Sequence, residues 1–301
     1  MQSTRLIKRQ IQSTKNTAKI TRAMEMVSAA KMRKSQEATL IARPYAEAAL
    51  KLLNNVCDSM ESNKDYPLTH KRKVEKLCLL VITSDKGLCG GLNSSVLKEA
   101  TRIITANEGK EISLITIGKK AEKFFRGKQN VIAVFENIGD TVELMETLPI
   151  SRMLMDDFLN KKYDKVIAVY TNFVSTLKQE VEKRNVLPVS KSSIKRTVDE
   201  LGKDEIGRTK KIVDDTEYVF EPSPEEVLKK LLPNLVETQI FHVILESNAS
   251  EHSARMVAMK NATDNANELL EDLKLYYNSA RQGKITQEMT EIAAGVAAQE
   301  K

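Results

Sequence analysis

The chain has 301 residues, of which 41% are apolar, 29% charged and only 5% aromatic, with no Trp. This balance is typical of long helices with much solvated surface and argues against an all-β sandwich or barrel. The formal net charge of +6 permits an acidic partner but does not choose among nucleic acid, anionic lipid and an acidic protein surface.

The N-terminal region predicts one long helix. Between Ser3 and Val56 there is no Gly and the only Pro is Pro44, so we expect an interruption, if any, near Arg43. Nine of the first 34 residues are Lys or Arg, and only Glu25 is acidic. The spacing predicts that one stripe packs on a second helix. It consists of Ile20, Ala23, Val27 and Ala30.

The middle of the chain predicts a small α/β domain. Four β-branched runs indicate strands, at 76–83, 111–118, 130–135 and 165–173. Helical segments at 94–104 and 149–162 separate several of them, which favours a mainly parallel, Rossmann-like sheet. Residues 175–190 alternate less cleanly and predict an added strand or a hairpin.

The last third predicts a second long helix. It begins at Ser223 and Pro224, where Ser can cap and Pro suits the first turn. Four-three spacing predicts a coiled-coil seam that weakens at Gly283. Its members are Ala262, Ala266, Leu269, Leu273, Tyr276, Ala280 and Gly283. Ile285, Met289, Ile292 and Val296 resume the spacing in a different phase.

These segments give a predicted organisation of four parts. They are an N-terminal coiled-coil helix (1–60), a central α/β domain (74–190), a charged exposed excursion (191–222) and a C-terminal coiled-coil helix (223–301). The fold class is therefore α/β, with a long antiparallel coiled coil of the terminal helices.

The glycine-rich segment "TSDKGLCGGLN" (83–93) follows a predicted strand, where such a turn can cradle phosphate. It fits neither G-x-G-x-x-G nor G-x-x-x-x-G-K-[ST], so we expect no nucleotide there. We expect Gly87, Gly90 and Gly91 to allow tight backbone geometry, Asn93 or Ser94 to cap the next helix, and Cys89 to be structural.

Three co-linear segments resemble the gamma subunit of F-type ATP synthases. They are "NTAKITRAMEMVSAAKMRKSQ", "SDKGLCGGLN" and "ARMVAMKNATDNANELLEDLKLYYNSARQGKITQEMTEI". The resemblance extends from about residue 4 to residue 296, although residues 190–221 contribute nothing to it. It implies an asymmetric central shaft within a ring of three alpha and three beta subunits, with epsilon and the membrane c-ring as further partners. Turning of this rotor by proton flow would drive ATP synthesis on beta and regulate ATP hydrolysis.

The resemblance also implies contact residues. Those that would meet beta are Lys19, Arg22, Met24, Lys31, Arg33, Lys34, Arg255, Arg281, Gln282, Thr286 and Glu291. A signature loop facing the lower stalk or the base of beta would comprise Asp85, Lys86, Gly87, Cys89, Gly90 and Gly91. The basic residues could instead only solvate the helix, and Arg255 could form a plain helix salt bridge.

No catalytic, cofactor or metal site is expected. His70, His242 and His252 are scattered, and the three Cys, Cys57, Cys78 and Cys89, form no C-x-x-C pair. The family implies a non-catalytic subunit on the cytoplasmic face of a bacterial inner membrane, or on the matrix side of a mitochondrial one. The first residues are interpreted as mature protein. A passive coiled-coil scaffold and a basic nucleic-acid-binding coiled coil are the alternatives.

Overall fold

The computed structural model describes residues 4–58, 67–138, 142–190 and 224–299. In the long helices it describes side chains over 4–38 and, residue 228 excepted, over 226–295. Contacts divide the chain into two compact units, one of Met1–Ser28 with Arg255–Lys301 and one of Ala29–Ala254. The charged excursion expected at 191–222 lies outside the described residues.

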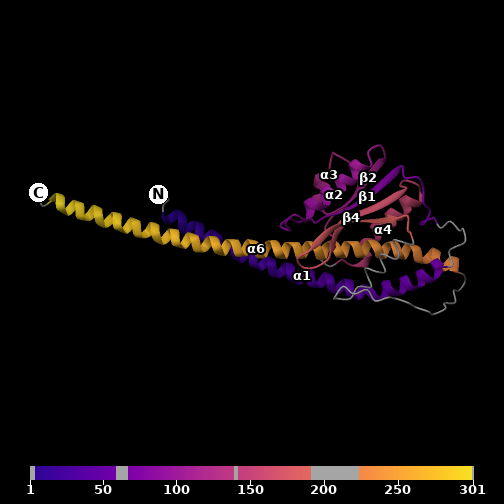
Figure 1. Cartoon of the computed structure of the whole chain (residues 1–301), viewed down its shortest axis with the longest axis horizontal. Coiled ribbons are helices and arrows are strands. Elements are labelled where there is room, and N and C mark those ends of the chain that lie inside the picture. Colours follow the sequence, from indigo (N-terminus) through magenta and orange to yellow (C-terminus); the bar gives the residue numbers. More distant parts are fainter. Residues whose placement is uncertain (1–3, 59–66, 139–141, 191–223, 300–301) are drawn as a thin grey trace. The chain divides into compact units, whose positions relative to one another are not determined.

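Two long helices occupy the two ends of the sequence (Figure 1). Helix α1 spans Thr4–Asp58 and continues past position 44. Helix α6 spans Pro224–Gln299 and begins at the proline expected in its first turn. Pro233 lies inside its early part. Both predicted long helices are confirmed.

The second unit contains a five-stranded sheet in the order β3-β2-β1-β4-β5. The strands are β1 (Lys76–Ile82), β2 (Glu111–Ile117), β3 (Asn130–Phe135), β4 (Lys165–Phe173) and β5 (Gln179–Leu187). The first four run parallel, while β5 pairs antiparallel with β4. The four predicted strands and the added hairpin are therefore confirmed.

Helices cover both faces of this sheet (Figure 1). Leu77, Leu79 and Val81 of β1 pack against buried residues of α2 (Leu92–Ala106) and α3 (Lys119–Phe125) on one face. The alternate residues Cys78 and Leu80 face the other core. Because it is buried on both faces, β1 reads as a continuous apolar run rather than an alternating one.

The opposite core is formed by α4 and by the first third of α6. Helix α4 spans Leu144–Leu159 and contributes Ile150, Leu154 and Phe158, all fully buried. The segment of α6 from Leu232 to Leu245 packs into the same cluster. This segment therefore belongs to the α/β unit, although the sequence places it in a coiled-coil helix.

Local helix signals explain two differences from the expectations. Helix α3 has only seven residues, which is too short for the spacing of apolar residues to reveal it. Helix α4 begins at Leu144, five residues before Pro149. The Glu146 side chain accepts a hydrogen bond from the Glu143 backbone N–H at 3.1 Å and caps that start.

The turn from β2 into α3 requires glycine. Gly118 has φ +90, and a Cβ there would lie 2.1 Å from the carbonyl oxygen of Thr83. A side chain at 118 would therefore push the end of β2 away from the end of β1. Gly127 also has a positive φ, +72, but a Cβ there would meet nothing within 4 Å.

We expect Gly118→Ala to lower the free energy of unfolding by more than about 3 kcal/mol, because backbone strain and a steric clash add. Gly127→Ala is the matched control, with a loss of about 1 kcal/mol from the positive φ alone. Urea unfolding of the full chain, followed by circular dichroism, measures both. Equal losses would show that the approach to Thr83 is unimportant.

Candidate functional site

In the first unit the two long helices meet along one row of side chains each. The row on α1 follows four-three spacing and is largely polar or small; its buried members are Ile7, Ala18, Thr21 and Ser28, with Ile11, Thr14 and Glu25 half-buried between them. The row on α6 has the same spacing. Its buried members are Met259, Thr263, Ala266 and Leu270, and Leu273, Tyr277 and Ala280 are half-buried.

The seam predicted for α1 is wrong. Ile20 and Val27 are 60% and 53% exposed, and Ala23 and Ala30 are exposed too. The apolar pattern indicated the wrong row because the actual seam contains Thr21 and Ser28, and the Thr21 hydroxyl has its partner, Thr263, across the seam. The most apolar row of this part of α1 is thus left on the surface.

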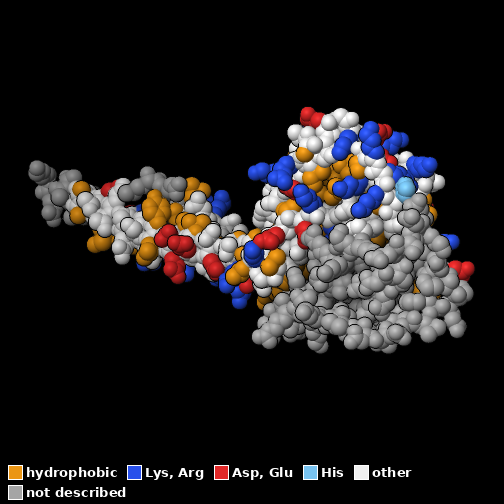
Figure 2. All heavy atoms as spheres, turned by 45° about the vertical axis from the view of Figure 1, so that its right-hand side comes forward, with side chains coloured by type: hydrophobic (Ala, Val, Ile, Leu, Met, Phe, Trp, Pro, Cys, Tyr) orange, Lys and Arg blue, Asp and Glu red, His pale blue; other side chains and the backbone are white. Residues whose placement is uncertain are grey.

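The seam predicted for α6 is half right. Ala266, Leu273 and Ala280 lie in it, but Leu269 and Tyr276 are each 49% exposed. Their places are taken by Leu270 and Tyr277, one position further along the helix. Figure 2 shows hydrophobic side chains on the surface of the helix pair, among acidic and basic ones.

A hydrogen bond between two threonines fixes the register of this pair. The hydroxyls of Thr21 and Thr263 lie 2.7 Å apart and are buried. The Thr263 hydroxyl also donates to the Met259 carbonyl at 2.8 Å. Counting equal numbers of residues outward along antiparallel helices places Thr4, where α1 begins, level with Ala280.

Beyond this level the described part of α1 no longer accompanies α6. Every residue from Arg281 to Gly295 is exposed, and Figure 1 shows the end of α6 running past the start of α1. Gly283, where the sequence pattern weakens, therefore lies just past the level of Thr4, the first described residue of α1. Ile285, Met289 and Ile292 form an apolar row there, 47–68% exposed.

The contact residues expected near the C-terminus lie on this single helix. Arg281, Gln282, Thr286 and Glu291 are all exposed. The Thr286 hydroxyl donates to the Gln282 carbonyl at 3.0 Å, and Gln287 Nε2 donates to Glu291 Oε1 at 2.9 Å. Over the described residues, no hydrogen bond or ion pair engages the side chain of Arg281 or Gln282.

The expected contact residues on α1 have differing surroundings. Lys19 is exposed, Arg22 pairs with Glu25 at 3.0 Å, and Met24 is half-buried. Within the second unit, Arg33 and Lys34 are exposed, while Lys31 is half-buried and engaged with the chain. Arg255 is only 7% exposed and also has a partner within the chain, so it is less accessible than the others.

In the second unit, the signature loop between β1 and α2 ties three strand ends together. The Asp85 carboxylate accepts hydrogen bonds from the backbone N–H of Lys119 at 3.0 Å and of Asn137 at 2.9 Å. These residues follow β2 and β3. The Thr83 hydroxyl accepts from the backbone N–H of Ala121 at 2.9 Å. Asp85 therefore positions backbone rather than a ligand.

Asn93 holds the interior of the same loop and does not cap α2 as expected. Its Oδ1 accepts from the Ser84 N–H at 3.0 Å, and its Nδ2 donates to Ser84 Oγ at 2.7 Å and to Cys89 Sγ at 3.2 Å. Gly91 occupies the N-cap position. Cys89 is 2% exposed, which agrees with a structural role.

The tip of the signature loop carries an unusual leucine. Gly90 has φ +60, as a tight turn allows, but Leu88 has φ +65, a conformation that costs most non-glycine residues about 1 kcal/mol or more. Leu88 is also 61% exposed. The loop therefore holds an apolar side chain in solvent.

This loop lies where doubly wound folds bind ligands. The chain passes from β1 to β2 on one side and returns to β4 on the other, so the carboxyl ends of β1 and β4 flank a switch point. Here Thr83, Asp85 and Asn93 bond the backbone of the loop or of the segments that follow β2 and β3. The arrangement favours a rigid protein surface over a phosphate cradle.

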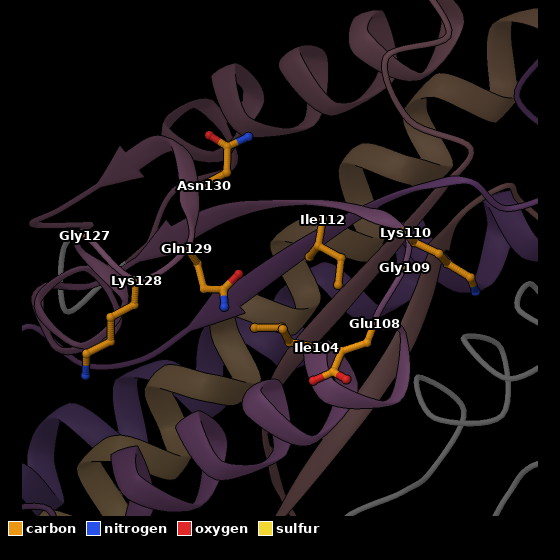
Figure 3. A pocket seen from close by; sticks show the side chains of 9 residues that line it. All are labelled: Ile104, Glu108, Gly109, Lys110, Ile112, Gly127, Lys128, Gln129 and Asn130. Atoms are coloured by element: carbon orange, nitrogen blue, oxygen red, sulfur yellow. The ribbon is translucent and has the colours of Figure 1, made fainter.

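A shallow pocket of about 640 Å³ lies at the opposite edge, beside the amino ends of β2 and β3 (Figure 3). Its charged groups do not converge. Lys110 Nζ donates to Asn107 Oδ1 at 2.7 Å, Lys128 Nζ lies 4.7 Å from the Phe124 ring centroid, and the two lysines point apart. The pocket lacks the convergent polar groups of a small-molecule site.

The described residues offer little else that could bind a metal, react or cross a membrane. No group of three or more His, Cys, Asp or Glu side chains is placed there to hold a metal ion. Burial raises the pKa of the Cys78 thiol, which keeps it protonated and unreactive. No helix among the described residues is long and apolar enough to cross a membrane.

A family model described as ATP synthase matches residues 3–299. An ATP synthase gamma chain from Dehalococcoides mccartyi is 42% identical over 300 residues, and one from Roseiflexus castenholzii is 43% identical over 304; each comparison covers 99% of both chains. The chain belongs to the ATP synthase gamma chain family. The gamma-chain resemblance of the three sequence segments is thereby confirmed.

Solved structures agree with this family. The central stalk of Tetrahymena thermophila mitochondrial ATP synthase has a TM-score of 0.57 and 26% identity, covering 81% of this chain and 99% of that one. A rotor chain of the Euglena gracilis enzyme, at 20% identity and a TM-score of 0.60, covers 94% and 98% and shows the same fold. This gamma-family chain is therefore a central-stalk rotor subunit.

Sequence reasoning missed three features of these surfaces. The Thr21–Thr263 pair was hidden because threonine carries no hydrophobic signal. Leu88 and Leu177, 61% and 83% exposed, are single apolar residues in turns, where periodicity is uninformative. The positive φ of Leu88 could not be predicted from the sequence, because Gly87 and Gly90 in the same turn are the residues expected to adopt it.

The threonine pair can be tested by a double-mutant cycle. We expect Thr21→Val and Thr263→Val each to cost about 1 kcal/mol, because each leaves the other hydroxyl without its partner across the seam. The double variant should cost less than the sum, with a coupling energy of about 1 kcal/mol. Thermal unfolding of the four chains measures this. Strict additivity would show that the pair does not set the register.

The role of Asp85 can be tested separately. Asp85→Ala removes the acceptor of two backbone N–H groups, so we expect a loss of about 2–3 kcal/mol in the free energy of unfolding. Asp85→Asn keeps one oxygen and should lose about half as much. Asp264→Ala, an exposed carboxylate on α6, is the control and should change stability little. If Asp85→Ala left the free energy of unfolding unchanged, Asp85 would not hold the three strand ends together.

Proposed function

We propose that this chain is the non-catalytic rotor that couples proton-driven rotation of a membrane ring to ATP synthesis in a ring of alpha and beta subunits. One copy would serve three alpha and three beta subunits, with epsilon and the c-ring attached to the same rotor. The observation that carries this proposal is the single helix beyond Ala280, whose residues 281–295 are all exposed.

This single helix needs surroundings that the described chain does not provide. In proteins most of the stability of a helix comes from packing of one face, and this part of α6 has no face packed on the described chain. Its exposed row of Ile285, Met289 and Ile292 is apolar, and such rows mark protein contacts. A channel through a ring of subunits would surround the helix and cover this row on every side.

The helix pair of the first unit has unlike faces, as coupling requires. The α1 side carries Arg5, Lys8, Lys15 and Lys19, together with the exposed Ile20, whereas α6 presents acidic residues. These exposed acids are Asp264, Glu268, Glu271 and Asp272. A ring subunit would therefore meet a different charge and shape at each rotary step, and only such differential contacts can change its nucleotide affinity.

The contact residues proposed for beta are those of the resemblance. Arg281 can donate two parallel hydrogen bonds to a carboxylate, and Gln282 can both donate and accept. Thr286 and Glu291 would support them, while Lys19, Arg22, Met24, Lys31, Arg33, Lys34 and Arg255 would contribute along α1 and at the start of the shaft. Asp85 and the signature loop would form a separate surface facing beta or the lower stalk.

The chain would be peripheral to the cytoplasmic face of a bacterial inner membrane. The gamma-family relatives from Dehalococcoides and Roseiflexus are bacterial, which supports this location over a mitochondrial one. A nucleic-acid-binding role is not supported, because the exposed acids of α6 lie in the same unit as the bases of α1.

Reconstitution with alpha and beta from the same source tests the function. We expect assembly in a ratio of three alpha, three beta and one chain, together with restored ATP hydrolysis. Further addition to membranes that hold the c-ring should make hydrolysis pump protons. A chain that fails to join the ring, or joins without supporting turnover, would contradict the proposal.

Arg281 gives a residue-level prediction. Arg281→Ala should lower ATP hydrolysis of the reconstituted complex by about tenfold, because the loss of a charge-assisted hydrogen bond costs about 1.5 kcal/mol. Arg102→Ala is the matched control: Arg102 is 72% exposed and pairs with Glu99 at 3.3 Å within α2. Equal ATP hydrolysis by the two variant complexes would show that Arg281 makes no important contact with beta.

A further inference from the structure

The hairpin between β4 and β5 presents a leucine in solvent. Leu177 is 83% exposed, the most exposed of the large hydrophobic residues over the described side chains, and Val174 beside it is 49% exposed. Both lie in the turn that joins Phe173 to Gln179. Burying such a leucine against a partner is favourable, and leaving it in water has no benefit to folding.

The turn itself is rigid. The backbone N–H of Ser175 donates to the Lys178 carbonyl at 2.9 Å, and the Lys178 N–H donates to the Ser175 carbonyl at 3.1 Å and to its hydroxyl, also at 3.1 Å. Gln179 Nε2 lies within 3.1 Å of the carbonyls of Ser175 and Thr176. The backbone around Leu177 is thus fixed before any partner arrives.

The turn is also fastened to α6. The Ser253 hydroxyl donates to the Thr176 carbonyl at 2.7 Å, and the Ser250 hydroxyl donates to the Thr171 carbonyl at 3.0 Å. Gln179 Nε2 contacts the Ser253 hydroxyl at 3.3 Å. Ser253 is two residues before Arg255, where the same helix passes into the shaft residues. A force on Leu177 would therefore be transmitted directly to the backbone of α6.

Leu177 shares its edge of the sheet with Leu88. Strands β1 and β4 are parallel neighbours, so the loops that follow them leave from the same edge. Leu88 is exposed with φ +65 in one loop, and Leu177 is exposed in the other. Lys86 and Lys120 are exposed beside Leu88, and the neighbouring Asp85 carboxylate is occupied by backbone N–H groups.

We propose that the tip of the β4–β5 hairpin, through Leu177, docks into an apolar socket bordered by carboxylates on a subunit of the catalytic ring. The inference rests on the proposed rotor function, since the ring is the partner that the shaft enters. Two observations favour this partner. The hairpin is fastened to α6 at Ser253, two residues before the first residue of the shaft. Its edge of the sheet also carries the signature loop, with the exposed Leu88 and Lys86 at its tip. The contact would form at one rotary position and break as the rotor turns to the next.

Site-specific photocross-linking in the complete complex tests the contact. A photoreactive p-benzoylphenylalanine replaces Leu177 in the complex of alpha, beta, epsilon and this chain. We expect cross-links to alpha or beta, identified by mass spectrometry. Met145, 72% exposed on α4, carries the same probe as the control and should give none with the ring. Cross-links from position 177 only to epsilon, or none at all, would overturn the proposal.

Dissociation kinetics give a second measurement. Leu177→Asp should release the chain from the assembled ring about tenfold faster, because the variant loses one buried leucine and places a charge against carboxylates. Met145→Asp should dissociate like the natural chain. Both positions are exposed in the free chain, so neither variant should lower its melting temperature.

These outcomes separate the hairpin contact from the rotor function. If Leu177→Asp assembles and hydrolyses ATP but dissociates at the natural rate, the docking proposal is wrong and the rotor function stands. If the natural chain itself does not assemble with the ring, the proposed function fails first, before either leucine variant is compared.

Discussion

The register set by Thr21 and Thr263 determines what the rest of the first unit can present. One buried hydroxyl pair, 2.7 Å apart, aligns Thr4 with Ala280 and so decides which part of α6 is paired and which part is single. A slip by one heptad would place Thr21 level with Leu270 or Met256 instead of Thr263. A polar pair within a seam of small residues opposes such slips, because a displaced threonine would face an apolar neighbour.

The same register explains why the seam is polar. Seam positions filled by Ala18, Thr21 and Ser28 allow a close helix pair that uses little of its hydrophobic surface. The larger apolar residues, such as Ile20, Val27 and Leu269, remain outside at 49–60% exposure. A protein selected for stability alone would bury them. Their position is instead what a shaft needs if its outer surface, rather than its interior, makes the specific contacts.

How far the sequence could be interpreted depended on the length and regularity of each element. The strands were predictable because β1 is buried on both faces and the neighbouring strands are β-branched. The long helices were predictable from the absence of Gly and the placement of Pro. The seam of α1 was not, because Thr and Ser take its central places and the apolar row on the outside gave the stronger signal. The family's contact residues came from resemblance, and they remain proposals.

The switch point of the sheet shows why a fold alone does not give a function. In a doubly wound sheet this edge commonly receives a dinucleotide. Here the side chains of Thr83, Ser84, Asp85 and Asn93 make their hydrogen bonds to the loop and to the neighbouring strand ends, so none of these four converges on an outside ligand. What the edge offers instead is Leu88 and Leu177 on two rigid turns. Apolar tips on fixed backbones suit another protein better than a nucleotide, because their burial requires a complementary surface and no loop has to be ordered first.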